Sequence, residues 1–231
     1  MDGLLFDMGD VLYDATGWRR WLWKQLVRMG YPFHYTNFWH TWDEQFLSAV
    51  HRGERLWQTA FDEFLKQQGL PSGAVQEINC ASHYQKQRLE SQTKPLLGVI
   101  ETLEVLHRRG LKLGVLTDSE SSATAVGVRL ERMGLGGLFL SIVSSRDLQQ
   151  TKPAPACYLA ALNELHLSIE QTAFVGHDWD ELQGAAQLGL CTIAFNAPPQ
   201  IPADYHLRRF ADLLQVSQQP TTITTYYKKS A

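Results

Sequence analysis

The chain has 231 residues, of which 44% are hydrophobic and 19% are charged, which is typical of a folded globular protein and argues against intrinsic disorder. Its formal net charge of −3 and pI near 6.2 give no strong basic field, so nucleic acid is not an expected partner. No apolar run approaches the ~20 residues of a membrane span, and the first predicted strand leaves no room for a signal peptide. We therefore expect a cytoplasmic protein without a membrane partner, with one large domain or a core and a smaller companion.

The first feature along the chain is LLFDMGDVLYD at residues 4–14, where a short apolar run leads directly into aspartates and a glycine. The run at 4–6 is too short to assign by periodicity, but a continuous apolar segment before a turn is typical of a buried parallel strand. Asp7 would then lie at the carboxyl end of that strand.

From residue 16 the pattern becomes helical. Apolar residues recur at three- and four-residue steps in successive stretches at about 16–29, 38–49, 56–65 and 71–89. Thr16 is a possible N-cap of the first helix, and Gly30 is its predicted end. Six of the seven tryptophans lie between Trp18 and Trp57, and we interpret these aromatic stripes as the core of a helical bundle.

Beyond residue 94, predicted strands and helices alternate. The predicted strands are 112–116, 138–143, 172–175 and 191–195, and the predicted helices are 98–109, 123–133, 154–165 and 181–188. This alternation predicts an α/β fold with a doubly wound parallel sheet, in which ligands bind at the carboxyl ends of the strands. Residues 216–231 have no clear periodicity, and we expect a loose tail there.

The cysteines Cys80, Cys157 and Cys191 are odd in number and share no spacing typical of metal ligands. We interpret them as buried thiols in a reducing compartment.

Segments at the predicted strand ends resemble the motifs of the haloacid dehalogenase (HAD) superfamily, most of whose members are phosphatases. FDMGDV resembles the first motif, with Asp7 at the position of the nucleophile, and LGVLTD resembles the second, with Thr117 after a hydrophobic strand. TKPAPACY, which contains Lys152, resembles the third motif, and FVGHDWDELQGA resembles the acidic fourth motif. Because these segments occur in order over residues 3–195, they are a strong signal for the fold.

The resemblance implies a Rossmann-like core formed by residues 1–14 and 90–215, a helical cap domain formed by 15–89, and a tail at 216–231. It also implies hydrolysis of a small phosphomonoester, in which Asp7 attacks phosphorus and forms an aspartyl-phosphate that water then hydrolyses. A Mg²⁺ ion would remove the repulsion between this carboxylate and the phosphate.

The residue roles that follow from the resemblance are specific. Thr117 and Lys152 would donate to the phosphate oxygens, and Asp118 would orient the loop or contact the substrate. Asp7, the carbonyl of Gly9 and Asp178 would hold the metal. The partner would be a small phosphorylated metabolite, and the chain could be a monomer or a homodimer.

One departure from the family's pattern concerns the general acid and base. Most phosphatases of the family carry a second aspartate two residues after the nucleophile, and here that position is Gly9. Loss of a positioned acid typically costs ~10²–10⁴-fold in rate, so activity could be low unless the leaving group is good or another donor acts. Asp10, one residue later, is the candidate replacement, with a side chain that should point differently. The carbonyl of Gly9 can still bind a metal, because this ligand needs no side chain.

The other departure is GHD where the family usually has GD. Strict register puts His177 at the metal-ligand position and Glu181 at the later acidic position. Because Mg²⁺ prefers oxygen ligands, we expect Asp178 to reach the ion, directly or through water, with His177 turned aside; a histidine-tolerant ion such as Mn²⁺ is the alternative. Asp178, Asp180 and Glu181 could also cap the following helix, and we expect at least one of them to do so.

Two other functions stay open. The dehalogenases of the superfamily lack the second aspartate and use no metal, but they have a bulky aromatic residue there and a less acidic fourth motif than GHDWDE. A catalytically impaired protein could also keep the fold and bind a phosphorylated ligand. The sequence does not identify the substrate, because specificity would depend on cap residues that also look like core.

Overall fold

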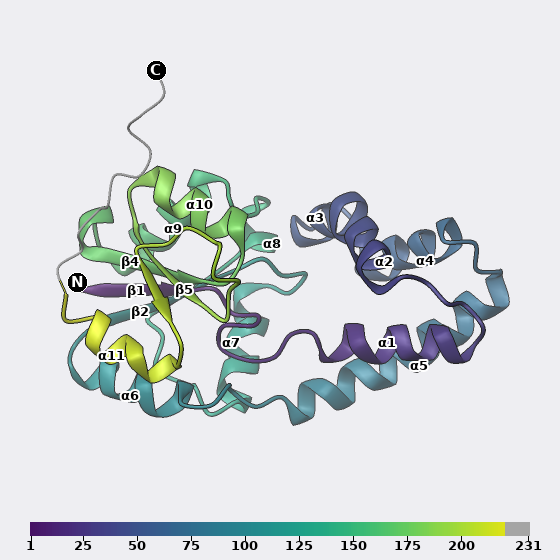
Figure 1. Ribbon diagram of the computed structural model, residues 1–231, viewed down its shortest axis with the longest axis horizontal. Coiled ribbons are helices and arrows are strands. Elements are labelled where there is room, and N and C mark those ends of the chain that lie inside the picture. The colour runs from purple at the N-terminus through teal and green to yellow at the C-terminus, as the bar shows by residue number, and fades with distance from the viewer. Residues whose placement is uncertain (220–231) are drawn as a thin grey trace, which may run out of the picture.

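Parallel strands form the centre of the computed structural model, which describes residues 1–219 (Figure 1). The strands are β1 (Gly3–Phe6), β2 (Lys112–Thr117), β3 (Ser141–Ser144), β4 (Thr172–Gly176), β5 (Cys191–Phe195) and β6 (Tyr205–Leu207). Within the described residues they form one six-stranded sheet in the order β3-β2-β1-β4-β5-β6, and every neighbouring pair is parallel. This arrangement confirms the predicted α/β class with a doubly wound parallel sheet.

Helices cover both faces of this sheet. They are α6 (Val99–Arg108), α7 (Ala123–Arg132), α8 (Ser145–Leu148), α9 (Pro155–Leu165), α10 (Trp179–Leu188) and α11 (Leu213–Val216), with 3-10 turns at Ile169–Gln171 and Phe210–Asp212. Leu4 and Phe6 pack with α6, α7 and α11 on one face, whereas Leu5 packs with α9 and α10 on the other. Because successive strand side chains point to opposite faces, β1 contributes to both cores and is buried at every position.

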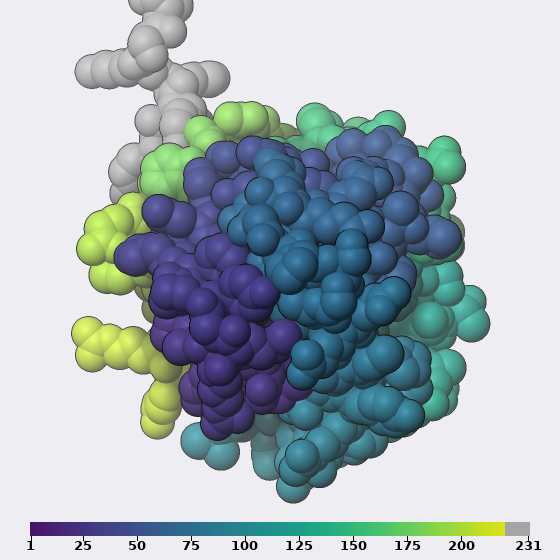
Figure 2. Space-filling view, turned by 90° about the vertical axis from the view of Figure 1, so that its right-hand side faces the viewer, coloured from purple at the N-terminus to yellow at the C-terminus, as the bar shows by residue number. Residues whose placement is uncertain are grey.

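A separate helical lobe lies between β1 and α6 in the sequence. Its helices are α1 (Gly17–Arg28), α2 (Tyr35–Trp42), α3 (Ser48–His51), α4 (Trp57–Gln67) and α5 (Ser72–Gln92), and a π-helical turn, Asp43–Leu47, joins α2 to α3. The lobe lies beyond the carboxyl ends of the strands (Figure 1). Seen from that end, it covers most of the view and leaves the core visible around its margin (Figure 2).

The helical lobe has its own hydrophobic core, as the aromatic stripes predict. Trp42 is 2% exposed and has ring contacts with Phe46, Phe61 and Phe64. The other buried members of this cluster are Leu22, Leu26, Phe38, Trp39, Val50, Ala60, Leu65, Leu70, Val75 and Ile78. Since none of them belongs to the clusters beside the sheet, the lobe is stabilised mainly by packing within itself.

Contacts between the lobe and the core converge on the loop that follows β2. Ser145 Oγ donates a hydrogen bond to the carbonyl oxygen of His51, at 2.9 Å, and also accepts one from the amide of Ser119. Lys86 on α5 lies 3.7 Å from Glu120 in the same loop. The lobe is therefore anchored next to the carboxyl ends of the strands, where ligands bind in this class of fold.

Several sequence expectations need correction. The strand predicted at 138–143 begins only at Ser141, because Gly137 adopts a positive φ of 74° and the amide of Leu138 bonds back to the carbonyl of Leu135 in a turn. β6, α8, α11 and the 3-10 turns were not predicted, since each has only three or four residues. Thr16 precedes α1 but does not cap it with its side chain, which donates to Asp14 instead.

Two further expectations are only partly met. Cys157 and Cys191 are buried as expected, but Cys80 is exposed on α5. Of the tail predicted as loose, Val216 ends α11 and Ser217 is buried, while residues 220–231 lie outside the described part of the chain. No helix in residues 1–219 is both long enough and apolar enough to cross a membrane.

Candidate active site

Asp7 follows β1 directly and lies near the middle of the sheet edge. Its amide donates to the carbonyl of Val175 at 2.9 Å, which continues the pairing of β1 with β4 by one residue. Its side chain is 7% exposed. A buried strand thus delivers one carboxylate to the carboxyl end of the sheet, as the apolar run before Asp7 predicts.

Lys152 neutralises this carboxylate from the loop before α9. Its buried Nζ donates to Asp7 Oδ1 at 2.5 Å and to the carbonyl of Leu116 at 3.1 Å, and it lies 2.9 Å from Glu181 Oε1. Burial would lower the pKa of Lys152, but the two carboxylates outweigh it and raise that pKa well above its ordinary value. Lys152 is therefore a permanent cation held between Asp7 and Glu181.

The charge of Asp7 depends on its neighbours. Burial would raise the pKa of Asp7, but Lys152 and then His177 outweigh it and hold that pKa below its usual range. The group is therefore ionised near neutral pH, which a nucleophilic carboxylate must be.

Thr117 and Asp118 approach the same point from β2. Thr117 is the last residue of β2, pairs with Ser144 of β3, and is 5% exposed. Asp118 accepts a hydrogen bond from the backbone amide of Lys152 at 3.2 Å, so it ties the β2 loop to the lysine loop. Burial raises the pKa of Asp118 above its ordinary value.

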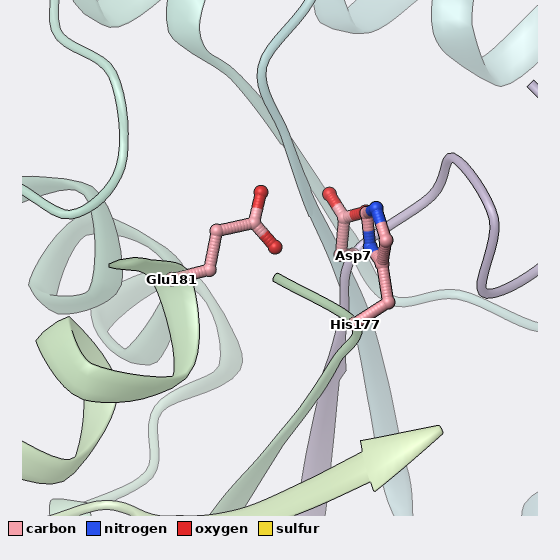
Figure 3. Close-up of side chains that lie close together, drawn as sticks. All are labelled: Asp7, His177 and Glu181. Carbon is pink, nitrogen blue, oxygen red and sulfur yellow. The ribbon is translucent and has the colours of Figure 1, made fainter. Parts of the chain in front are cut away.

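His177 and Glu181 complete the group around Asp7. His177 follows β4, and its Nδ1 lies 3.5 Å from Asp7 Oδ2, while Glu181, on the first turns of α10, points its carboxylate toward Asp7 (Figure 3). One ligand atom from each of these three residues lies within 4.8 Å of the others. Burial, and then the charge of Asp7, raise the pKa of Glu181 to about 7.

Asp178 and His177 are placed in the reverse of the expected way. Asp178 was predicted to reach the ion, but its side chain accepts from the amide of Asp180 at 2.9 Å and caps α10. His177 was predicted to turn aside, yet it faces Asp7. The reason is local, because the first amides of α10 need an acceptor and Asp178 stands at the N-cap. The expectation that one of the three acids caps this helix is confirmed.

Gly9 and Asp10 form the turn after Asp7. Gly9 has no positive φ, whereas Asp10 has a φ of 55°. The Oδ1 atom of Asp10 accepts from the amide of Ala15 at 3.0 Å, and its Oδ2 lies 4.0 Å from His177 Nε2. The late aspartate therefore faces the far side of the His177 ring.

The residues present fit a bound divalent cation. Both His177 Nδ1 and Glu181 Oε2 are buried atoms without a hydrogen-bond partner. An unpartnered buried polar atom is costly, and two of them beside a third carboxylate form a donor set that a cation would satisfy. The donor set contains carboxylate oxygens and one imidazole nitrogen.

Strict register of the fourth motif points to His177 and Glu181, which are the residues that face Asp7, whereas the preference of Mg²⁺ for oxygen ligands favours Asp178. Tyr158 belongs to the third motif, but its contact was not predicted. Its hydroxyl donates to the backbone carbonyl of Glu181 at 2.7 Å and so links α9 to α10. A tyrosine three residues after Pro155 is the only sequence signal for this contact.

Comparisons with known proteins agree on one family. A family model described as haloacid dehalogenase-like hydrolase matches residues 1–189. A pyrophosphatase PpaX from Halalkalibacterium halodurans is 31% identical over 130 residues, which are 53% of this chain and 60% of that protein. A pyrophosphatase PpaX from Bacillus pumilus is 27% identical over 191 residues, which are 78% of this chain and 86% of that protein.

Among solved structures, a 2-haloacid dehalogenase from Pseudomonas syringae pv. Tomato DC3000 is similar over 94% of this chain and 98% of that one. The TM-score is 0.62 and the sequence identity is 26%.

Proposed function

Since the chain belongs to the haloacid dehalogenase-like hydrolases, we propose that it hydrolyses a small phosphomonoester through an aspartyl-phosphate intermediate on Asp7, with a divalent cation. Mg²⁺ is the ion that the family resemblance implies. The observation that supports this proposal most is the group formed by Asp7, His177 and Glu181, because a cation at that point allows a carboxylate to approach a phosphate dianion. The two pyrophosphatase relatives also support a reaction at phosphorus.

The chain's own residues would bind and orient the phosphate. Lys152 already lies 2.5 Å from Asp7 Oδ1, so its ammonium would donate to a phosphate oxygen next to the attacking carboxylate. The Thr117 hydroxyl, at the end of the neighbouring strand, would donate to a second oxygen. Asp118 would keep Lys152 in place through the backbone amide that it accepts from.

Attack by Asp7 forms a bond from a carboxylate oxygen to phosphorus and breaks the bond from phosphorus to the substrate alcohol oxygen. The leaving alkoxide then needs a proton. Water next hydrolyses the acyl-phosphate, which releases phosphate and restores the carboxylate. The cation, held by Asp7, His177 and Glu181, would neutralise charge that develops on the phosphate oxygens.

The source of the proton is the weak point of this site. Gly9 has no side chain to donate it, and Asp10 faces the far side of His177 at 4.0 Å. We therefore propose that activity is greatest with leaving groups that need little protonation, such as another phosphate or an acidic alcohol. The helical lobe from α1 to α5, which contains most of the segment 15–89 expected as a cap, would act as the cap and select the substrate.

The experiment is phosphate release from a panel of phosphometabolites and pyrophosphate, with and without added divalent cation. Metal-dependent release from at least one compound supports the proposal. Binding of a phosphate mimic without turnover of any compound would instead indicate a phosphate-binding protein on a hydrolase fold.

The likeness to a 2-haloacid dehalogenase over nearly the whole chain favours a second candidate, displacement of halide from a 2-haloacid by Asp7. That reaction would need no metal, and the acidic group around Asp7 is then unexplained. Metal-independent halide release from 2-chloropropionate, without phosphate release from the panel, would establish this candidate over the first.

A further inference from the structure

We propose that the cation site of this protein uses the imidazole nitrogen Nδ1 of His177 as a ligand, and that the site therefore selects Mn²⁺ over Mg²⁺. This inference rests on the proposed function only for the presence of a divalent cation near Asp7. It does not depend on which phosphorylated compound is hydrolysed.

The contacts of His177 leave Nδ1 available. Nδ1 is buried and has no hydrogen-bond partner, and its 3.5 Å separation from Asp7 Oδ2 is too long for a good hydrogen bond. On the other side of the ring, Nε2 lies 4.0 Å from Asp10 Oδ2. With its proton on Nε2, the side that faces the Asp10 carboxylate, His177 would present the lone pair of Nδ1 to the site, the arrangement usual for histidines that bind metals.

A protonated His177 paired with Asp7 would be the simplest alternative, but it accounts for only one of the two unpartnered atoms, His177 Nδ1. It would leave Glu181 Oε2 buried and without a partner, because Lys152 reaches only Oε1. A cation between Asp7 Oδ2, His177 Nδ1 and Glu181 Oε2 satisfies both unpartnered atoms at once. Lys152 already compensates Asp7 Oδ1, so the second oxygen of Asp7 is the one left for the cation.

The nitrogen ligand determines which ion is favoured. Mg²⁺ is a small, hard ion that takes oxygen ligands and keeps several waters. Imidazole is a better ligand for first-row transition ions than for Mg²⁺, and Mn²⁺ is the member of that series that also suits the carboxylate and water ligands of this site. The Asp178 carboxylate, which would restore an all-oxygen set, is committed to the N-cap of α10.

The direct test is electron paramagnetic resonance (EPR) of the metal-free protein titrated with Mn²⁺. Loss of the free-ion signal gives the affinity, competition with Mg²⁺ gives the preference, and pulsed spectra detect a ¹⁴N nucleus bound to the ion. We expect tight Mn²⁺ binding with ¹⁴N coupling, and weak competition by Mg²⁺.

Variants isolate the role of His177. His177→Asp should abolish the ¹⁴N coupling and allow Mg²⁺ to compete much more strongly, and His177→Ala should abolish the coupling without a new carboxylate. Asp10→Asn removes the negative charge 4.0 Å from His177 Nε2, so it should weaken Mn²⁺ binding. The matched control is His34→Asp, at the exposed N-cap of α2, which should change none of these values. Melting curves for each variant establish that it is folded.

Mn²⁺ bound without ¹⁴N coupling, coupling that survives in His177→Ala, or no Mn²⁺ binding at millimolar concentration would each overturn the inference. These outcomes differ from failure of the proposed function, which is decided by phosphate release. An enzyme that releases phosphate with Mg²⁺ and shows no ¹⁴N coupling would keep the function and lose this ion site.

Discussion

Three ionisable side chains at the sheet edge define the chemistry at the scale of single residues. Lys152 lies between Asp7 and Glu181, and all three are largely withdrawn from water. Removing one partner of a buried ion pair typically costs 3–5 kcal/mol of stability, because it leaves the other charge uncompensated. The three side chains therefore depend on one another for their stability. This interdependence places Asp7 in an ionised, fixed orientation before any substrate arrives.

The sequence predicts part of this arrangement well. The motifs place Asp7 and Thr117 after predicted strands and Lys152 before a predicted helix, and in the structure Asp7 and Lys152 are in contact. The sequence does not predict which of His177 and Asp178 faces Asp7. That choice depends on the first turn of α10, whose amides need a hydrogen-bond acceptor. They compete with any ligand for the carboxylate of Asp178.

Restoring the missing acid tests the role of Gly9. Gly9→Asp should raise turnover of substrates with poor leaving groups by ~10²-fold or more, with little change for an activated phenyl phosphate. The backbone allows it, because φ at Gly9 is not positive, but an added Cβ would lie 3.2 Å from the Cβ of Ala15. Steady-state kinetics of Gly9→Asp, with and without Ala15→Gly to relieve that contact, measure the effect.

Asp10→Asn is the companion variant. If Asp10 supplies the proton, this change should lower the turnover of substrates with poor leaving groups as strongly as Gly9→Asp raises it. The rates are compared at saturating divalent cation, so that weaker metal binding in Asp10→Asn does not contribute. Equal rates for wild type, Gly9→Asp and Asp10→Asn on every substrate would then contradict the view that proton donation limits this site.

At the scale of elements, α10 is positioned by its close approach to the lysine loop. A Cβ on Gly184 would lie 2.5 Å from Pro153 Cβ and 2.9 Å from the Pro153 carbonyl oxygen. Gly184 is three residues after Glu181, so both lie on the same side of the helix. A small residue here is thus what allows Glu181 to reach Lys152.

Gly184→Ala should therefore push α10 away from the Lys152–Pro153 segment. We expect a loss of ~1–3 kcal/mol in the free energy of unfolding, as is usual for overpacking, together with a fall in kcat. Chemical denaturation and steady-state assays provide the two values. Gly73→Ala is the control, because nothing lies within 4 Å of a Cβ there and the residue is in a helix. A Gly184→Ala protein as stable and active as Gly73→Ala would show that the close approach has no consequence.

The aromatic core of the helical lobe makes a separate prediction. Trp42→Ala should cost ~3–5 kcal/mol in the free energy of unfolding, because Trp42 is fully enclosed by other rings. Trp57 is half-buried beneath the ammonium of Lys86, so Trp57→Ala should cost less. If Trp57 also contacts substrate, its loss raises KM. Urea unfolding gives the loss of stability in each variant. Equal losses for Trp42→Ala and Trp57→Ala would argue against separate roles of these two tryptophans in the lobe.

Elements with a long periodic signal were predicted within a few residues, and short ones were not. β5 was predicted to the residue, and α9 and α7 to within one residue, since their apolar residues recur over several turns or form a continuous buried run. β3 is offset because residues 138–140 are apolar but precede the strand: Leu138 and Phe139 pack against the core, and Leu140 is exposed. Apolar character alone does not distinguish a strand from an apolar connecting segment.

At the scale of the whole molecule, the lobe and the core meet through polar contacts beside the site. Arg129 of α7 lies 3.4 Å from Glu90 of α5, and Lys86 lies 3.7 Å from Glu120. These ion pairs are partly exposed, so each contributes little to stability. Weak contacts of this kind would allow the proposed cap to move over the site and admit substrate.

His51, at the end of α3, makes this contact sensitive to acid. Burial lowers the pKa of His51 although Glu120 and Asp118 act in the opposite direction. The folded state thus disfavours the charged ring, so its contribution to stability is present above the unfolded pKa of about 6.5 and is lost as pH falls below that value. The melting temperature of the wild type should fall more steeply between pH 7 and pH 5 than that of His51→Gln. Parallel curves for the two proteins would contradict this assignment, and His34→Gln is the matched exposed control.

The most direct test of the whole account is whether Asp7 becomes phosphorylated during turnover. With the best substrate from the phosphate-release panel, a reaction quenched in acid within its first turnover should yield a phosphoryl group on the peptide that contains Asp7, detected by mass spectrometry. Asp7→Asn should show neither this adduct nor phosphate release. Phosphate release by the wild type without any adduct on Asp7, or continued release by Asp7→Asn, would contradict the proposal that Asp7 is the nucleophile.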